Sequence, residues 1–272
     1  RLLNIKHTNP ISVGDYVKFE KIQELDKGEI LKIFPRKNYI IRKSVNLSKE
    51  THILASNLDQ AILVITLKRP RIYYEFIDRF LITSNAYQIP TIIVFSKSDT
   101  YVKEELKEVE MVRKIYADLN IYCLLISCHK KKDISKILGL IKNKTTLFSG
   151  NSGVGKSTLI NYLNPKLNLK TQSVSKSSNK GRHTTTFAQM YDIDKNTRVI
   201  DSPGIKGFGL VDIEKNEIYR YFPELLEASK KCRFKNCIHI DEPECEVKKR
   251  LVTGKISNYR YESYINLIHE KK

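Results

Sequence analysis

The sequence has no long hydrophobic run and only 11 glycines among its 272 residues. Its longest apolar stretch, residues 61–67, is far shorter than the roughly 20 residues that a membrane-spanning helix needs. No stretch resembles a secretory signal peptide. These absences argue against membrane and secreted proteins, and we expect no membrane partner. The chain begins with Arg1 instead of Met, which leaves the position of the true N-terminus open.

The sequence also lacks the cysteine pattern of a disulfide-stabilised protein. Its five cysteines are an odd number, and most of them lie in one cluster with a histidine instead of being spread as a framework. We therefore expect a reducing compartment and a cytoplasmic protein. A length of 272 residues indicates two or three domains with ample core.

Acidic residues are scarce relative to basic ones. The chain has 30 Asp and Glu against 48 Lys and Arg, a formal net charge of +18. Residues 134–191 contain no acidic residue at all, which indicates a phosphate-rich partner larger than a nucleotide. The alternative is an ordinary solvated surface in a lysine-rich protein. The basic residues of this stretch are Lys136, Lys142, Lys144, Lys156, Lys166, Lys170, Lys176, Lys180 and Arg182.

Residues 147–161 read LFSGNSGVGKSTLIN and contain a phosphate-binding loop of the form G-x-x-x-x-G-K-[ST]. An apolar run precedes the loop and a helical pattern follows it, which is the context that this motif requires. Lys156 can reach the β- and γ-phosphates and is a candidate catalytic residue, and Ser157 can bind Mg²⁺. A chance match is rare in a chain with so few glycines. The predicted nucleotide-binding residues here are Gly150, Asn151, Ser152, Gly153, Val154, Gly155, Lys156, Ser157 and Thr158.

Two segments downstream are typical of a magnesium-dependent nucleotide hydrolase. Residues 198–200 predict a strand that delivers Asp201-Ser202-Pro203-Gly204, which matches D-x-P-G. We expect Asp201 to hold Mg²⁺ and the Gly204 N–H to face the γ-phosphate. Thr185 in GRHTTT is expected to bind Mg²⁺ with GTP and to release it after hydrolysis, as a switch. The D-x-P-G match alone could also be an ordinary turn, because Pro-Gly favours turns.

The residues that select the base precede the phosphate loop. Residues 91–95 predict a strand that ends in Ser96-Lys97-Ser98-Asp99, close to the guanine-reading N-K-x-D. The Asp99 carboxylate can accept hydrogen bonds from guanine N1–H and the exocyclic amine, and Lys97 would lie over the base. A second predicted strand, residues 121–126, ends in Ser127-Cys128, where a backbone N–H can reach guanine O6. This motif order is that of a circularly permuted GTPase.

The motifs SKSD, GNSGVGKST, GRHTTT and DSPGIKGFGL together resemble the ribosome small-subunit-dependent GTPases, the RsgA or YjeQ family. The resemblance covers almost the whole chain, because Asn57-Leu58-Asp59-Gln60 and the N-terminal stretch are similar as well. It implies hydrolysis of GTP to GDP and phosphate, stimulated by the small ribosomal subunit late in its maturation, with contacts to rRNA. We expect a monomer.

The sequence departs from that family at two positions of the base site. Ser96 replaces the usual Asn, and we expect its shorter side chain to supply only part of the amide's tethering and to weaken guanine binding. Cys128 replaces a small Ala, and we expect this exchange to be tolerated because Cys is also small.

The catalytic group must also come from an unusual place. Gly204 is followed by Ile205 and Lys206, neither of which can accept a proton from the attacking water. The family carries a His at the position of His183, which neighbours Thr185 and titrates near neutrality. We therefore take His183 as a candidate catalytic residue, beside Thr185 and Lys156. The alternative is that His183 only packs or contacts RNA.

The first 55 residues have the pattern of a small β-domain. Strand-forming side chains alternate with polar ones and are interrupted by Gly14, Gly28 and Pro35. The resemblance implies an OB-fold barrel that binds RNA through a basic face. Without the resemblance, any small β-domain would fit this pattern. The residues that could supply the basic face are Lys32, Arg36, Lys37, Arg42 and Lys43.

Cys232, Cys237, His239 and Cys245 near the C-terminus have the spacing C-x4-C-x-H-x5-C. Three thiolates and one imidazole can complete a closed tetrahedral Zn²⁺ site with no open position. Unrelated buried cysteines are the alternative, but the short spacing favours one structural zinc per chain, and the family has the same arrangement. Tyrosines at helical spacing beyond residue 258 predict a terminal helix whose aromatic stripe packs, with RNA stacking as the alternative.

Strands that alternate with amphipathic helices predict an α/β fold with a mostly parallel sheet. We predict three parts: an OB-fold barrel over residues 1–55, a circularly permuted P-loop GTPase domain over residues 56–212, and a zinc-binding helical domain over residues 213–272. Residues 213–229 predict a helix bent near Pro223. Two other classes stay open: a P-loop ATPase or small-molecule kinase, and an RNA-binding protein that senses GTP without turnover.

Overall fold

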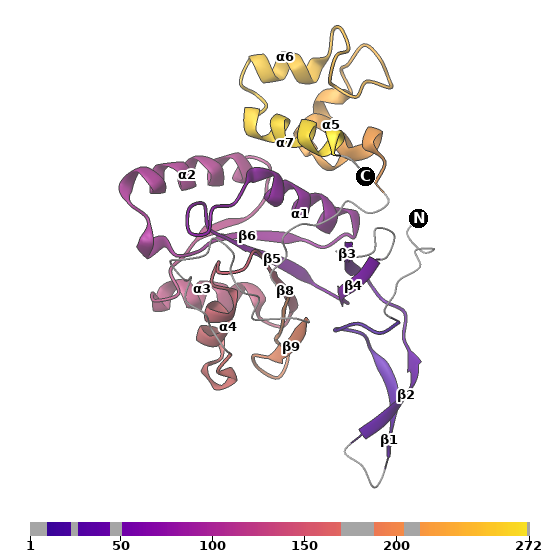
Figure 1. Ribbon diagram of the computed structural model, residues 1–272, viewed down its shortest axis with the longest axis vertical. Helices are drawn as coiled ribbons and strands as arrows, with labels where there is room; N and C mark the ends of the chain where they lie inside the picture. The colour runs from indigo at the N-terminus through magenta and orange to yellow at the C-terminus, as the bar shows by residue number, and fades with distance from the viewer. Residues whose placement is uncertain (1–9, 23–26, 44–50, 170–187, 204–212, 271–272) are drawn as a thin grey trace.

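The computed structural model describes residues 10–22, 27–43, 51–169, 188–203 and 213–270 (Figure 1). At its centre lies a six-stranded sheet in the order β7-β6-β5-β8-β10-β9. Five neighbouring strands are parallel, and β9 pairs antiparallel with β10 at one edge. The strands are β5 (Gln60–Ile65), β6 (Thr91–Phe95), β7 (Cys123–Leu125), β8 (Thr145–Ser149), β9 (Gln189–Asp192) and β10 (Arg198–Asp201).

Helices cover both faces of this sheet (Figure 1). Because successive side chains of a strand point to opposite faces, Leu63 and Ile65 pack with α1 and α2, whereas Ile62 and Val64 pack with α3 and α4. All of β5 is therefore buried, as expected for a central strand of a parallel sheet. The helices are α1 (Tyr74–Ala86), α2 (Lys103–Ala117), α3 (Lys131–Ile141) and α4 (Lys156–Leu163).

The predicted strands agree closely with the observed ones inside this sheet. Residues 91–95 form β6 with the predicted bounds, and the apolar run before the phosphate loop forms β8, whereas β7 is shorter than the predicted residues 121–126. Short 3-10 turns, η1 (Ser98–Thr100) and η2 (Pro165–Leu167), follow β6 and α4. The mostly parallel α/β sheet is confirmed. Among the residues that the structure describes, no helix is long and apolar enough to cross a membrane.

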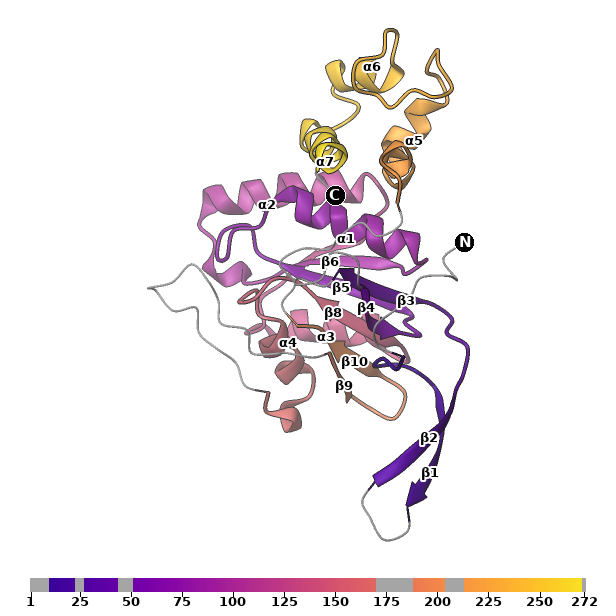
Figure 2. The same cartoon turned by 45° about the vertical axis from the view of Figure 1, so that its right-hand side comes forward.

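The N-terminal region contains two separate two-stranded antiparallel sheets, β1 (Val17–Ile22) with β2 (Lys27–Ile33) and β3 (Tyr39–Lys43) with β4 (Thr51–Ser56). Ile40 and Ile53 of the second pair belong to the same core as α1 and α2. The β1–β2 hairpin projects away from the body (Figure 2). The described residues form no closed barrel, so the OB-fold assignment stays a prediction.

The C-terminal region is helical and packs against α1. The predicted bent helix over residues 213–229 is a 3-10 helix, η3 (Lys215–Tyr221), followed by α5 (Pro223–Ser229). Pro223 occupies the first turn of α5, where its missing N–H would have no helical partner anyway. Two further helices, α6 (Glu246–Val252) and α7 (Asn258–His269), follow. Tyr264 of α7 is fully buried, which confirms packing as its role.

Candidate GTP site and candidate metal centre

Four of the predicted motifs meet at one edge of the sheet. β6, β7, β8 and β10 run parallel, and their carboxyl ends lead into Ser96–Asp99, Ser127 and Cys128, the phosphate loop, and Asp201. In open α/β sheets this edge is where ligands bind. The structure therefore brings the base-reading and phosphate-binding motifs together, although the base-reading motif comes about 50 residues earlier in the chain.

The phosphate loop has the backbone that its glycines permit. Gly150 and Gly155 have φ angles of +143° and +96°, which side chains rarely allow. A Cβ on Gly150 would lie 2.1 Å from the carbonyl oxygen of Val64, so the loop lies directly on β5. Gly155 is the N-cap of α4, whose N-terminus faces the loop and favours a bound phosphate.

Lys156 lies buried inside this loop. Its Nζ donates hydrogen bonds to the carbonyl oxygens of Gly150 at 2.7 Å and Asn151 at 3.0 Å. Burial lowers the pKa of Lys156 to about 8, against the opposing effect of the Asp201 carboxylate. Both of these hydrogen-bond acceptors are neutral carbonyl oxygens. A phosphate bound in the loop would add an anionic partner and would raise the pKa of Lys156.

Ser157 and Asp201, two of the predicted magnesium ligands, lie next to each other. The Ser157 hydroxyl donates to the Asp201 carboxylate over 3.3 Å, and Asp201 is only 2% exposed. A hydroxyl and a carboxylate at this separation, beside a phosphate loop, fit the oxygen-rich surroundings that Mg²⁺ prefers. The residues present thus fit the ion, with Ser157 and Asp201 as the groups that would hold it.

Ser96 joins the base-reading loop to the phosphate loop. Its buried hydroxyl lies 2.6 Å from the carbonyl oxygen of Val154 in the phosphate loop and 3.1 Å from that of Ile65 at the end of β5. Since one hydroxyl carries one proton, it can donate to only one of these acceptors at a time. We expected Ser96 to be too short for a full tether, and the structure shows that it reaches the phosphate loop directly.

Lys97 and Asp99 lie in the turn that follows. Lys97 has a left-handed φ of 60°, and its Nζ donates to the carbonyl oxygen of Arg69 at 3.0 Å. Burial lowers the pKa of Lys97. Burial would raise the pKa of Asp99, but hydrogen bonds with Ser127 and with the backbone outweigh it and lower this pKa. Asp99 is therefore an anion at neutral pH and can accept hydrogen bonds.

Ser127 and Cys128 close the opposite side of the candidate base site. The backbone N–H of Ser98 donates to the carbonyl oxygen of Ile126 at 2.9 Å, which holds the two loops together. Burial and the nearby Asp99 carboxylate raise the pKa of the Cys128 thiol to about 11, so the thiol is neutral. The small neutral side chain agrees with the expected tolerance of Cys at this position.

Several predicted residues lie outside the described part of the chain. These include the catalytic candidates His183 and Thr185, the glycine Gly204 of the D-x-P-G motif, and the basic residues Lys170, Lys176, Lys180 and Arg182. Their roles stay predictions.

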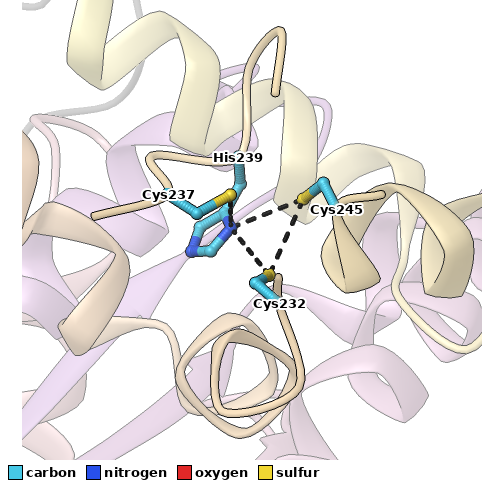
Figure 3. A group of neighbouring side chains, drawn as sticks. All are labelled: Cys232, Cys237, His239 and Cys245. Carbon is cyan, nitrogen blue, oxygen red and sulfur yellow. Dashed lines mark hydrogen bonds between the residues drawn. The ribbon is translucent and has the colours of Figure 1, made fainter. Parts of the chain in front are cut away.

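The four predicted zinc ligands form one cluster (Figure 3). Nδ1 of His239 lies 3.6 Å, 3.2 Å and 3.5 Å from the sulfur atoms of Cys232, Cys237 and Cys245. The sulfur atoms of Cys232 and Cys245 are 4.0 Å apart. With zinc bonds of about 2.3 Å to sulfur and about 2.0 Å to nitrogen, tetrahedral ligands lie roughly 3.5–3.8 Å apart. The donor set and its spacing fit a tetrahedral zinc ion.

Residues that the spacing pattern did not reveal hold this cluster in place. The Glu242 carboxylate accepts hydrogen bonds from the backbone N–H groups of Ile238 at 2.6 Å and Ile240 at 2.9 Å. From α7, the Tyr261 hydroxyl donates to the carbonyl oxygen of His239 at 2.7 Å. Tyr261, one of the tyrosines for which the sequence predicts packing, therefore also holds the ligand loop, a role that only the tertiary contact reveals.

Comparison with known proteins decides the family. A family model described as RsgA GTPase matches residues 33–211. The chain belongs to the RsgA GTPase family. The small ribosomal subunit biogenesis GTPase RsgA of Flavobacterium psychrophilum is 51% identical over 270 residues, which are 98% of this chain and 83% of the relative. The protein of the same description from Bacteroides fragilis is 46% identical over 272 residues, 100% of this chain and 87% of the relative.

Solved structures of this family agree with the permuted architecture. The crystal structure of YjeQ from Thermotoga maritima superposes with a TM-score of 0.75 at 32% identity, covering 99% of this chain and 87% of that one. YloQ, described as a circularly permuted GTPase, gives 0.69 at 28% identity and covers 98% and 83% of the two chains. The predicted circularly permuted GTPase fold is thereby confirmed, and membership of this family identifies the protein as a GTPase.

Proposed function

We propose that this GTPase hydrolyses GTP to GDP and phosphate in response to the small ribosomal subunit and acts late in the maturation of that subunit. The observation that supports guanine specificity most directly is the Ser96 hydroxyl, which lies 2.6 Å from the phosphate-loop carbonyl of Val154. It ties the base-reading loop and the phosphate loop into one site. A P-loop ATPase or kinase would need no such connection.

Each side chain of the site has a proposed role. Asp99 accepts hydrogen bonds from the N1–H and the exocyclic amine of guanine, Lys97 lies over the base, and the Cys128 N–H donates to O6. Lys156 binds the β- and γ-phosphates. Ser157, Asp201 and, in the GTP-bound state, Thr185 hold the Mg²⁺ that neutralises phosphate charge.

The attacking water is oriented, in this proposal, by His183. Among side chains, histidine is the one whose unperturbed imidazole exchanges a proton near neutral pH, which suits it to accept a proton from water. Since Ile205 and Lys206 follow Gly204, this segment offers no group with that property. Thr185 and Gly204 respond to the γ-phosphate. The Asp201 segment leads directly into the C-terminal region, so a switch movement can be passed to that region.

The flanking regions are proposed to contact rRNA, with residues 1–55 as an OB-fold and residues 213–272 as a zinc-binding domain. The relatives described as small ribosomal subunit biogenesis GTPases support this assignment. A single zinc ion would bind Cys232, Cys237, His239 and Cys245, which lie together as three thiol groups and one imidazole. We further propose a monomeric, cytoplasmic protein, in line with the high positive charge of +18.

The decisive experiment measures phosphate release from GTP with and without purified small ribosomal subunits. We expect slow hydrolysis alone and strong stimulation by the subunits. GTP binding without turnover under both conditions would instead identify a non-enzymatic sensor. Calorimetry with GTP and ATP tests base choice in parallel, and equal affinities would refute the proposed base site.

Two substitutions test individual roles. Asp99→Asn should weaken GTP and favour xanthosine triphosphate, whose C2 oxygen needs a donor; continued preference for GTP would remove Asp99 from the base site. His183→Ala should abolish the stimulation by small subunits while GTP affinity stays nearly unchanged. Wild-type hydrolysis by His183→Ala on saturating subunits would exclude the catalytic role.

A further inference from the structure

Asp133 is a buried carboxylate of the GTPase body that carries no role in the proposed mechanism. It lies in the first turn of α3 and is only 8% exposed. Its Oδ2 accepts a hydrogen bond from the backbone N–H of Ser127 at 3.1 Å, and its Oδ1 lies 3.5 Å from Nζ of Lys136. It therefore connects α3 to the tip of the loop that closes the candidate base site.

This contact differs from an ordinary helix cap. An acidic residue in the third helical position usually accepts from the N–H of the N-cap residue, which for α3 is Lys130. Asp133 instead reaches three residues further back, to Ser127, the second residue after the end of β7. Lys131 and Lys132 share the first turn of α3, where a positive charge is unfavourable to the helix dipole. The sequence of this turn is thus not arranged for helix stability alone.

All three polar groups of Ser127 are engaged. Its N–H donates to Asp133, its carbonyl oxygen accepts from the N–H of Lys130 at 3.1 Å, and its hydroxyl accepts from the N–H of His129 at 3.2 Å. A hydrogen bond between Ser127 and the Asp99 carboxylate also opposes the effect of burial, which raises the pKa of Asp99, and contributes to the net lowering of this pKa. These hydrogen bonds together hold Ser127 in one position and orientation.

These bonds also set the direction of the next N–H group. The peptide between Ser127 and Cys128 is planar and trans, so the Cys128 N–H points opposite to the Ser127 carbonyl. That carbonyl points towards Lys130 at the start of α3. The Cys128 N–H therefore points away from the start of α3.

We propose that Asp133 is a positioning residue for guanine selection, which holds the Ser127–Cys128 peptide so that the Cys128 N–H meets guanine O6. The inference rests on the proposed base site. Asp133 does not touch the nucleotide and acts only through Ser127. Removing its carboxylate frees the Ser127 N–H, and the peptide that carries the O6 donor can then rotate.

The test uses two guanine analogues that change one edge position each. 6-Thio-GTP replaces O6 with sulfur, a poorer acceptor, and inosine triphosphate lacks the exocyclic amine that Asp99 would bind. In Asp133→Ala, we expect GTP affinity to fall by roughly threefold to tenfold, the equivalent of one ordinary hydrogen bond. The preference for GTP over 6-thio-GTP should fall towards one, whereas the preference over inosine triphosphate should stay within about twofold of wild type.

Matched variants separate positioning from general loosening. Asp133→Asn keeps an acceptor oxygen and should retain both preferences at their wild-type values. Asp133→Ser, whose hydroxyl is too short, should behave like Asp133→Ala and takes its place if the alanine variant folds poorly. Glu104→Ala removes an exposed first-turn carboxylate from α2 and should change neither preference. Unchanged discrimination in both short variants, or an equal loss of both preferences, would overturn the inference. Equal binding of all three nucleotides by the wild-type protein would instead refute the base site itself.

Discussion

The C-terminal region and the β1–β2 hairpin are both small, yet they are held in different ways. In the C-terminal region, residues 213–270, apolar side chains such as Phe222 and Tyr264 form a core that includes Ile82 of α1. The described residues of the hairpin form no such core: Phe19 is 63% exposed, and only Val17 and Ile33, one end residue of each strand, are even partly buried. The C-terminal region is therefore held by apolar burial against α1, whereas the hairpin is held by the pairing of its two strands.

A buried ionic cluster also holds the C-terminal region to the GTPase body. Arg260 of α7 is 3% exposed and forms ion pairs with Asp78 of α1 and, over 2.7 Å, with Glu224 of α5. The hydroxyl of Tyr116 in α2 donates to the same carboxylate of Asp78 at 2.8 Å. The guanidinium also lies 4.3 Å from the ring centroid of Phe222. Four helices thus meet at one charged side chain.

The largest effect should follow loss of the metal cluster. Cys237→Ser should remove the zinc ion and unfold the C-terminal region, because structural zinc contributes on the order of 10 kcal/mol to such folds. Elemental analysis and limited proteolysis measure both consequences, and GTP binding by the GTPase body should persist. Cys123→Ser changes a buried cysteine of β7 outside the cluster and should keep one zinc per chain. Full zinc content in Cys237→Ser would contradict the ligand assignment.

Arg260→Ala should have the next largest effect. It leaves the Asp78 carboxylate buried without its cation, which typically destabilises by about 3–5 kcal/mol. Denaturant unfolding should show this loss, and adding Asp78→Ala should recover part of it because the unpaired charge is gone.

Arg250→Ala is the matched control for Arg260. It removes an arginine from an i, i+4 pair with Glu246 in α6, which is more exposed, and should change stability by less than about 1 kcal/mol. Equal effects of the two arginine variants would show that the buried cluster does not hold the C-terminal region to α1.

A smaller effect is expected where the N-terminal region joins the body. The buried Asp15 carboxylate accepts hydrogen bonds from Arg36 and, at 2.6 Å, from the Ser56 hydroxyl. Arg36→Ala should destabilise by roughly 1.5–3 kcal/mol, as for other hydrogen bonds to charged groups. Lys37→Ala removes only an exposed pair with Asp59 and should change stability by less than about 1 kcal/mol.

The Arg36 effect should depend on pH. Burial alone would raise the pKa of Asp15, but its hydrogen bonds to Arg36 and Ser56 lower it below the ordinary value. The stabilisation is therefore present above the unfolded-state pKa of about 3.9 and is lost as the pH falls through the lower folded-state value. Thermal unfolding between pH 7 and pH 3 should show the difference between wild type and Arg36→Ala shrinking. A constant difference would mean that Asp15 carries no charge in the folded protein.

The distance along the chain between interacting residues explains what could be predicted from the sequence. The zinc ligands and the phosphate loop were predicted because their members lie close together in the chain and have characteristic spacing. The contacts of Ser96 with Val154 and of Arg260 with Asp78 join residues 58 and 182 positions apart, and no local pattern encodes them. Alternating residues predicted β1 and β2, but alternation cannot tell whether a strand face is covered.

The smallest effect should come from the hairpin. Phe19 lies in the middle of β1 with its side chain 63% exposed, and its pairing with Ile30 of β2 is the contact that the strand itself offers. Because an exposed aromatic contributes little burial, Phe19→Ser should change the free energy of unfolding of the whole protein by no more than about 0.5 kcal/mol. Phe80→Ser, at a fully buried position of α1, provides the contrasting value, since burying a hydroxyl there and losing the ring should destabilise by about 3–5 kcal/mol. A loss for Phe19→Ser comparable to that for Phe80→Ser would mean that the hairpin packs against another part of the protein in solution, and the contrast between the two regions would then fail.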